Sequence, residues 1–587
     1  MAQAGEQTGE TVQPILRALA AGDLLKAADL ADGCWARSRT PDVGYLRVLA
    51  RARMGDLSLA RKLYAEVGLS RSQELDHRAL GARLLKDEAF AAGPEAAEMF
   101  LAAADAYAGI FAATNDPYPG VNAASLMLFA GRGDRAQQLA QALLGHERLS
   151  EPSSYFDLVT VAEALLLLGR SEDSFTMLDA ATTAPDADIG ARASTRRQLT
   201  RLAQVLRLSE EKRAKLGQLL GSPTVIHFCG SAGDAAEEEL ASAIDEYLKA
   251  NSVQVAYGGI GSAAELAIAE RLLRQDAELN LVLPFSSDDY LPAVASGDRE
   301  RLERLQRCVS EASSVSVVTT APFRSDSNHD RHARDIAMGL AKARAAHLDA
   351  QVRQLAVTID GSEPADAQVW RQFAGKTAFV PVGGAVDSVF AEVGRGAADR
   401  SIKAILFADF PSFSTVPEEN VPIFWREVMQ RIATVLDRHS GAVRYRNTWG
   451  DAIYVIIATA ADAAAIALEL LEELSAADHA ALGVTGETQM RIGLHLGPIY
   501  EGLDFVTGDT TYYGRQVSLA ARIEPITPAG AVFVTEAFAA VLALRNVEGY
   551  GCEYVGVLDL PKGYGRERMY RLTRVNRIDW FGAEIAS

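Results

Sequence analysis

From about residue 10 to residue 215, this 587-residue chain repeats a short turn followed by a helix-forming segment rich in alanine and leucine. The turns at Gly22 and Gly55 are 33 residues apart, and those at Gly131 and Gly169 are 38 residues apart. A helical pattern with such a period is typical of stacked helical hairpins, because each hairpin buries its apolar face against the next. We therefore expect a helical-repeat array over residues 1–220, in which glycine and aspartate form turns and helix caps rather than ligands.

This array resembles tetratricopeptide repeats. Residues 118–124, with the sequence Tyr-Pro-Gly-Val-Asn-Ala-Ala, also resemble the TRAFs-binding helical regulatory region of apoptosis-signal kinases. The two resemblances imply a surface that binds a protein partner or joins copies of the chain. The alternative is a helical scaffold without a partner.

The pattern changes at about residue 222, where apolar strands begin to alternate with helices. Continuous apolar strands separated by helices are typical of a parallel sheet covered on both faces. Residues 222–395 therefore predict a Rossmann-like α/β domain, bounded by glycine-containing linkers at 217–223 and 394–398. The expected strands are 224–230, 253–257, 279–285, 314–318 and 355–359.

The second of these strands runs into a glycine turn, from Gly258 to Gly261, that opens a helix from Ala263 to Leu273. Free backbone amides at a helix start bind phosphate or carboxylate groups. The domain resembles the Rossmann-like nucleotide-sensing modules related to lysine-decarboxylase-like proteins, which implies a nucleotide ligand. The alternative is that the glycines only permit tight packing of strand on helix. We interpret His227, in the first strand, as a core residue rather than a catalyst.

Two aspartates in the last third of the chain, Asp409 and Asp451, lie 42 residues apart at the ends of expected strands. Asp409 closes the apolar run at 404–408, and Asp451 occupies the turn of an expected β-hairpin between 442–446 and 452–457. A turn explains either aspartate alone. As a pair, they match the carboxylate ligands that hard divalent cations use when they carry a triphosphate.

Two further blocks follow the aspartates, at 489–498 and 511–524. The order strand, helix, hairpin, helix, strand is the β-α-β-β-α-β arrangement of a ferredoxin-like sheet. With these blocks, residues 400–575 resemble the class III nucleotidyl cyclases, over about 30% of the chain. The resemblance implies a phosphorus–oxygen lyase that converts a nucleoside triphosphate to a 3′,5′-cyclic nucleotide and diphosphate.

The resemblance also implies roles for individual residues. Asp409 and Asp451 would hold two Mg²⁺ or Mn²⁺ ions, with the backbone carbonyl of Phe410 as a further ligand. Arg522 would stabilise charge on the α-phosphate, which suits a planar guanidinium that is always charged. Lys562 matches the lysine that grips the terminal phosphates, with a solvated turn lysine as the alternative. Because the family builds its site across a head-to-tail dimer, we expect at least a homodimer.

Two positions depart from the family pattern. Asn447 stands where an adenylyl cyclase has lysine, four residues before the second aspartate, and Ser518 replaces the usual ribose-positioning asparagine. Thr511 occupies the second base-reading position. An amide both donates and accepts hydrogen bonds, which suits the mixed edge of uracil or cytosine without excluding adenine. Tyr445 is a bulky neighbour that either narrows the pocket toward a smaller base or belongs to the core.

The base-reading positions make the chain resemble the pyrimidine cyclases of bacterial anti-phage signalling (Pycsar), which make cyclic UMP or CMP as a second messenger. We therefore expect a pyrimidine substrate, UTP before CTP. Three alternatives stay open: an adenylate cyclase in signalling, a degenerate cyclase domain used for dimerisation or nucleotide binding, and a nucleotide or NAD hydrolase in the Rossmann-like domain. Retention of both aspartates and Arg522 favours an active site, since a decaying site has no reason to keep charges that repel without metal.

Composition limits the other function classes. A net charge of −19, without any block of Lys or Arg, argues against nucleic-acid and anionic-membrane binding. An apolar fraction of 49% and a charged fraction of 23% are typical of a soluble globular protein. We expect no export leader and no membrane span, because no long uninterrupted apolar stretch occurs. Four scattered cysteines suit a reducing cytoplasm, so we expect a cytoplasmic protein without disulfides or a zinc site.

Overall fold

The computed structural model of the protein describes residues 12–93, 96–230, 237–325, 327–359, 363–382, 400–411, 413–475 and 489–575. The chain forms two compact units. The first comprises Met1–Pro223, Ala346–Ala350 and Asn576–Ser587, and the second comprises Thr224–Ala345 and Gln351–Val575. The expected linker at 394–398 lies outside the described residues, and the three domain boundaries stay a prediction.

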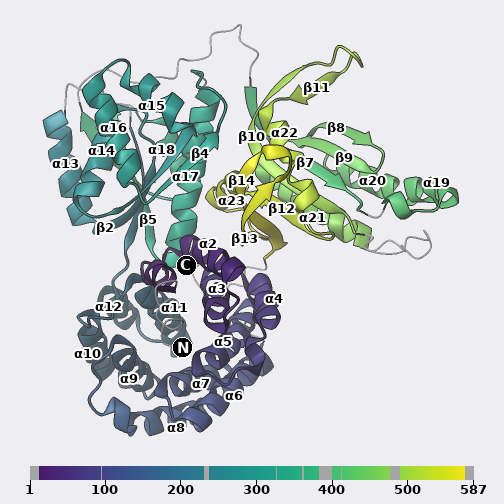
Figure 1. Cartoon of the computed structure of the whole chain (residues 1–587). Coiled ribbons are helices and arrows are strands. Elements are labelled where there is room, and N and C mark those ends of the chain that lie inside the picture. Colours follow the sequence, from purple (N-terminus) through teal and green to yellow (C-terminus); the bar gives the residue numbers. More distant parts are fainter. Residues whose placement is uncertain are drawn as a thin grey trace. The chain divides into compact units, whose positions relative to one another are not determined.

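The first unit is a curved array of successive helical hairpins (Figure 1). Its helical nature confirms the expectation from the repeated turns. Each helix packs its alanine- and leucine-rich side on its neighbours, and the buried side chains form successive clusters along the array. The helices are α2 (Leu24–Arg37), α3 (Pro41–Met54), α4 (Leu57–Val67), α5 (Leu75–Ala92), α6 (Ala97–Thr114), α7 (Pro117–Phe129), α8 (Gly133–Leu144), α9 (Tyr155–Leu167), α10 (Ser171–Thr182), α11 (Ile189–Val205) and α12 (Glu210–Leu220).

The repeated turn residues behave as the sequence predicts. The four turn glycines at 22, 55, 131 and 169 all have φ between 67° and 91°, in the left-handed region that favours glycine. Asp23 caps α2, because its side chain accepts a hydrogen bond from the backbone N–H of Lys26 at 3.2 Å. The glycine and aspartate residues of these turns are therefore structural.

The second unit contains a six-stranded parallel sheet in the order β4-β3-β2-β1-β5-β6, which confirms the expected parallel α/β sheet. Helices lie on both sides of it (Figure 1). The strands are β1 (Thr224–Gly230), β2 (Val253–Gly258), β3 (Glu278–Phe285), β4 (Ser314–Thr319), β5 (Gln351–Ile359) and β6 (Thr377–Val382). The helices are α13 (Glu237–Ala250), α14 (Ala263–Arg274), α15 (Ser287–Ala295), α16 (Arg299–Glu311), α17 (Ser327–Leu348) and α18 (Ala365–Phe373).

His227 is a satisfied core residue, as interpreted from the sequence. It is buried in β1, its Nδ1 accepts a hydrogen bond from Gln354 Nε2 at 3.0 Å, and its ring stacks on Trp370. Burial lowers the pKa of His227 to about 4. The imidazole is therefore neutral at physiological pH.

At the glycine turn before α14, side chains of the same segment already accept hydrogen bonds from the free backbone amides. Ser262 caps the helix by accepting from the backbone N–H of Glu265 at 3.1 Å, and the Glu265 carboxylate accepts from the N–H of Gly261 at 2.7 Å. A Cβ on Gly258 would lie 2.7 Å from the ring of Phe228. These contacts favour the tight-packing explanation of the glycines over an open phosphate site.

The second unit also contains an eight-stranded sheet in the order β13-β14-β12-β10-β7-β9-β8, with β11 paired to β10. The order β10-β7-β9-β8 and its antiparallel pairing give the expected ferredoxin-like β-α-β-β-α-β arrangement. The strands are β7 (Arg400–Asp409), β8 (Val443–Trp449), β9 (Ala452–Ile457), β10 (Arg491–Leu503), β11 (Thr510–Tyr513), β12 (Val532–Thr535), β13 (Tyr550–Leu560) and β14 (Gly565–Arg574). The helices that follow them include α20 (Gln430–Arg438), α21 (Ala460–Ser475), α22 (Arg515–Ala520) and α23 (Glu536–Leu544).

Within the described part of the chain, no helix is both long enough and apolar enough to cross a membrane.

Candidate active site

The two aspartates lie together at one end of the ferredoxin-like sheet. Strands β7 and β9 pair with Ala408 opposite Ile453, so Asp409 and Asp451 leave adjacent strands at the same edge. The backbone N–H of Phe410 donates to Asp451 Oδ2 at 3.3 Å. Burial, together with a hydrogen bond and the charge of Asp409, raises the pKa of Asp451 to about 6. The structure thus brings together the pair that the sequence singled out.

An arginine and a glutamate adjoin this pair. Arg491 Nη2 lies 2.8 Å from Asp409 Oδ2, and the same guanidinium forms an ion pair with Glu524. Burial raises the pKa of Glu524, and Arg491 opposes that shift. In the sequence, Arg491 and Glu524 lie within the blocks at 489–498 and 511–524 and have no local signal of their own. The signal that identifies them is the strand register, which places Arg491 directly opposite Asp409.

The donor set fits a hard divalent cation that is bound together with phosphate oxygens. Two carboxylates on neighbouring strands repel each other unless a cation lies between them, and Mg²⁺ typically uses one or two carboxylates with substrate phosphates. Among the described residues, no cluster of three or more His, Cys, Asp or Glu side chains could hold a metal by itself. The carbonyl of Phe410 accepts a hydrogen bond from Phe413 N at 3.1 Å and keeps a second lone pair. Its assignment as a ligand stays a prediction.

Arg522 and Lys562 come from a different part of the sheet. Arg522 follows α22, its guanidinium lies over the ring of Tyr564, and its buried Nε has no hydrogen-bond partner in the described structure. Lys562 is exposed in the turn between β13 and β14, with φ of 60°. Ser518 lies on α22, one turn before Arg522. In the described structure, neither Arg522 nor Lys562 forms a hydrogen bond or ion pair with the two aspartates.

The expected base-reading residues lie beside an aromatic cluster. On β8, Asn447 Nδ2 donates to the hydroxyl of Tyr445 at 3.2 Å, and Asn447 Oδ1 accepts from the N–H of Thr448 at 2.8 Å. The Tyr445 ring packs edge-on against Tyr454 and Tyr512. Thr511 on β11 is the chain neighbour of Tyr512. Tyr445 is therefore half-buried against the core, and its hydroxyl holds the Asn447 amide.

Residues 399–574 match the family model of the adenylate and guanylate cyclase catalytic domain. This part of the chain is a nucleotidyl cyclase domain. Residues 19–127 match the family model named Tetratricopeptide Repeats-Sensor. This match covers the first part of the helical array and agrees with its resemblance to tetratricopeptide repeats. No curated protein matches the chain.

Solved structures of nucleotidyl cyclases resemble the cyclase domain in fold. The adenylyl cyclase CyaB from P. aeruginosa is 18% identical over 30% of this chain and 96% of its own, with a TM-score of 0.28. The guanylate cyclase domain of RhGC from Catenaria anguillulae, in complex with GTP, is 19% identical over 30% of this chain and 98% of its own, with a TM-score of 0.27. The dimeric guanylyl cyclase domain of RhoGC from Blastocladiella emersonii is 18% identical over 31% of this chain and 100% of its own, with a TM-score of 0.26. At these TM-scores, the likeness does not indicate the substrate of this chain.

Proposed function

We propose that the cyclase domain forms a 3′,5′-cyclic pyrimidine nucleotide, with UTP giving cyclic UMP, and that its site is complete only in a homodimer. The observation that carries the catalytic part of this proposal is the adjacency of Asp409 and Asp451 at one sheet edge. The observation behind the base is the amide of Asn447 beside Tyr445.

In the proposed reaction, the ribose 3′-oxygen forms a bond to the α-phosphorus while the bond from the α-phosphorus to the bridging oxygen breaks. Diphosphate leaves, and the hydroxyl proton passes to water. Asp409 and Asp451 would hold two Mg²⁺ or Mn²⁺ ions, which make the 3′-hydroxyl more acidic and neutralise the triphosphate. Arg522 donates hydrogen bonds to the α-phosphate as its charge grows, Ser518 hydrogen-bonds the ribose, and Lys562 binds the terminal phosphates.

The homodimer is supported by where these side chains lie. Within one chain, Arg522 is held over Tyr564 and makes no ion pair with either aspartate in the described structure. A head-to-tail pair of chains would bring Arg522 and Lys562 of one copy to the aspartates of the other. Such an arrangement gives two equivalent sites in a symmetric dimer.

The choice of a pyrimidine rests on the hydrogen bonds that Asn447 keeps free. Its Nδ2 uses one hydrogen on Tyr445, and its Oδ1 uses one lone pair on Thr448 N. One donor and one acceptor remain, side by side, which complements the mixed donor and acceptor edge of uracil or cytosine. Thr511 would supply a further hydroxyl contact. A lysine at this position could only donate.

The wider role that we propose is second-messenger signalling in anti-phage defence, in the cytoplasm, with the cyclic nucleotide acting on a separate effector. Its support is the resemblance of the base-reading residues to pyrimidine cyclases, together with the sensor-type helical repeats. The repeats would also offer a surface to a protein partner.

The test is to incubate the purified full chain with each of the four nucleoside triphosphates and Mn²⁺, and to separate the products by chromatography. We expect a cyclic pyrimidine nucleotide and an equal amount of diphosphate. Asp409→Ala and Asp451→Ala should each lower turnover at least ~100-fold, because each removes a metal ligand. Asp559→Asn, which changes an exposed aspartate of the same domain, is the control and should leave turnover unchanged. Turnover within threefold of the original for both alanine variants would refute the site.

A further inference from the structure

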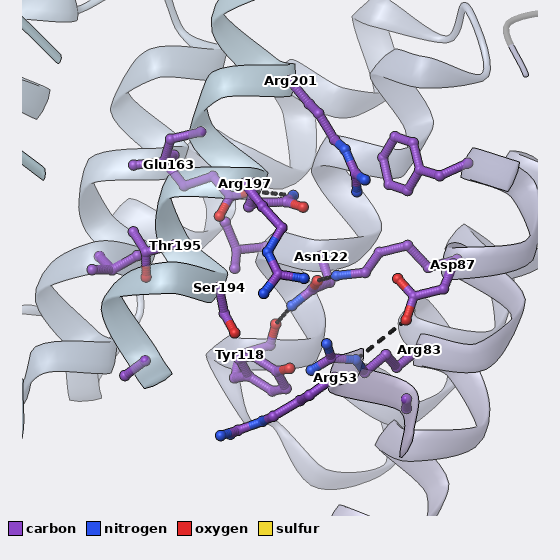
Figure 2. A pocket seen from close by; sticks show the side chains of 18 of the residues that line it. Arg53, Arg83, Asp87, Tyr118, Asn122, Glu163, Ser194, Thr195, Arg197 and Arg201 are labelled. Carbon is purple, nitrogen blue, oxygen red and sulfur yellow. Dashed lines mark hydrogen bonds and ion pairs between the residues drawn. The ribbon is translucent and has the colours of Figure 1, made fainter. Parts of the chain in front are cut away.

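The helical array contains a pocket that the cyclase reaction does not use. Helices α3, α5, α7, α9 and α11 border a cavity of about 350 Å³, within the range of small-molecule sites. Figure 2 shows Arg197 and Arg201 reaching from one helix into the space bordered by Tyr118 and Asn122. Its lining contains five cations, namely Arg53, Arg83, Lys86, Arg197 and Arg201.

The two carboxylates in the lining neutralise only part of this charge. Asp87 pairs with Arg83 at 3.3 Å. Glu163 is buried and accepts hydrogen bonds from Ser125 and Gln198, and burial raises its pKa. In the described structure, neither carboxylate forms an ion pair with the other cations. Five positive and two negative side chains give the lining a net charge of about +3 when all seven are ionised.

Three of the arginines form no ion pair in the described structure, although Asp188 acts on Arg53 from a distance, and Asp87 and Asp349 act in the same way on Arg197 and Arg201. Arg201 has only the ring of Phe90, 4.0 Å from its guanidinium carbon. Arg53 donates to the carbonyl of Leu19 at 3.4 Å, and Arg197 donates to the carbonyl of His347 at 2.7 Å. The Nε atoms of Arg53 and Arg197 are buried without a partner.

The cations of the pocket are also poorly hydrated. Burial lowers the pKa of Lys86 to about 8 and that of Arg197 to about 10, and it lowers the pKa values of Arg53 and Arg201. Like charges that are removed from water repel one another. The cluster of cations in the empty pocket therefore lowers the stability of the helical array. An anion with several oxygens would pair with the guanidinium groups and remove that cost.

The pocket also offers flat apolar surface. Tyr118 and Phe156 line it and are 39% and 46% exposed, whereas large aromatic side chains are usually more buried. Asn122, also in the lining, connects one ring to a cation, because its Oδ1 accepts from Lys86 Nζ at 2.9 Å and its Nδ2 donates to the carbonyl of Tyr118. Exposed rings beside arginines suit a ligand with a planar group next to its charged group.

We propose that this pocket binds a small phosphorylated molecule with at least two negative charges and a planar ring, such as a nucleoside diphosphate. Its phosphates pair with Arg53, Arg197 and Arg201, and its ring lies against Tyr118 or Phe156. Because the lining comes from several helices of the array, a bound ligand connects these helices and stabilises the array. The lining residues lie outside the cyclase domain, so this ligand does not depend on the cyclase substrate.

The test is calorimetric titration of the full chain with ADP, inorganic pyrophosphate and adenosine, in EDTA so that the cyclase site lacks divalent cations. We expect ADP to bind more tightly than pyrophosphate, and adenosine to bind at least ~10-fold more weakly than ADP, because charge-assisted hydrogen bonds carry the affinity. Arg201→Gln and Arg53→Gln should each weaken ADP binding by about tenfold or more. Arg135→Gln, on the exposed surface of α8, is the matched control and should bind within twofold of the original chain.

Two further variants separate this pocket from the cyclase site. Asp409→Asn and Asp451→Asn should keep full ADP binding in EDTA. Loss of binding in these two variants, or unchanged binding in both arginine variants, would assign the affinity to the cyclase domain and overturn the proposal. Absence of binding by both ADP and pyrophosphate would overturn it as well. Pyrophosphate binding equal to that of ADP would also overturn the proposal, because the planar ring would then contribute nothing. If Arg201→Gln does not fold, Arg53→Gln decides the test alone.

Discussion

The guanidinium of Arg491 lies 2.8 Å from a carboxylate oxygen of Asp409, and the same side chain forms an ion pair with Glu524. Strand β10 therefore supplies a fixed cation to one of the two carboxylates at the candidate metal site. Asp451 has no such counter-charge in the described structure and instead has Asp409 as its neighbour. The two aspartates are thus electrostatically unequal.

This inequality predicts opposite effects of Asp451→Asn on activity and stability. The pKa of Asp451 is raised to about 6, above its ordinary value of 3.8, so its ionised form at pH 7 destabilises the folded state. Without divalent cations, the variant should melt higher than the original chain, by about 2–4 °C for each kcal/mol of repulsion removed, reduced by solvent screening. It should also lose cyclisation. Scanning calorimetry in EDTA measures the shift, and Asp559→Asn should show none. A lower melting temperature would contradict the repulsion.

The composite site predicts complementation between two inactive variants. Asp409→Ala lacks a metal ligand, and Arg522→Ala lacks the donor to the α-phosphate. Mixed in equal amounts, they should regain up to about a quarter of full activity, because half of the dimers are mixed and each mixed dimer has one intact site. Turnover and sizing of the mixture check this outcome. Mixed dimers without any recovered activity would place the whole site within one chain.

Asn447 predicts a change of base preference. Asn447→Lys should shift the preference toward ATP, because lysine only donates and leaves the acceptor requirement of a pyrimidine edge unmet. An unpaired buried polar atom costs on the order of 1–3 kcal/mol, or roughly 5- to 150-fold in discrimination. A competition assay with mixed nucleotides measures the ratio. Thr448→Lys, on the opposite face of the same strand, is the matched control and should keep the original preference. If the original chain prefers ATP, the pyrimidine assignment is wrong and the cyclase assignment stands.

His495 predicts a loss of stability in acid. It is buried on β10, where Nε2 donates to Gln516 Oε1 and Nδ1 accepts from the hydroxyl of Thr535, both at 2.8 Å. Burial lowers its pKa to about 4, so its contribution is complete above the unfolded value of about 6.5 and is lost as the pH falls toward 4. The lost contribution is roughly 3 kcal/mol.

The matched experiment compares melting temperatures at pH 7 and pH 4.5. His495→Gln should melt lower than the original chain at pH 7 and lose less on acidification, because glutamine has no proton to bind. The buried His227, whose pKa is also lowered by burial, contributes equally to both proteins. The pKa of His332 is lowered by burial and by the charge of His495, so the smaller acid-induced loss of the variant includes this part of the His332 shift. An equal acid-induced loss in the two proteins would show that His495 is not the group that titrates.

Local patterns in the sequence determined much of the fold. The turn glycines at 22 and 55 recur at a helical-hairpin period, and the continuous apolar strands require a sheet covered on both faces. Asp409 and Asp451 stand at strand ends, and the apolar runs and turn residues beside them predict these positions. These features depend on residues near each other in the chain, and local propensity and burial decide them.

Only the tertiary structure decided which distant residues meet. The register of β7 with β10 places Arg491 on Asp409, and a shift of one residue would turn that side chain to the other face. The cationic pocket likewise joins Arg53 to Arg201 across about 150 residues, through the curvature of the stacked helices. Neither relationship can be predicted from a short stretch of sequence. Each depends on how whole helices and strands pack, and on the entropy cost of closing the long chain segments between them.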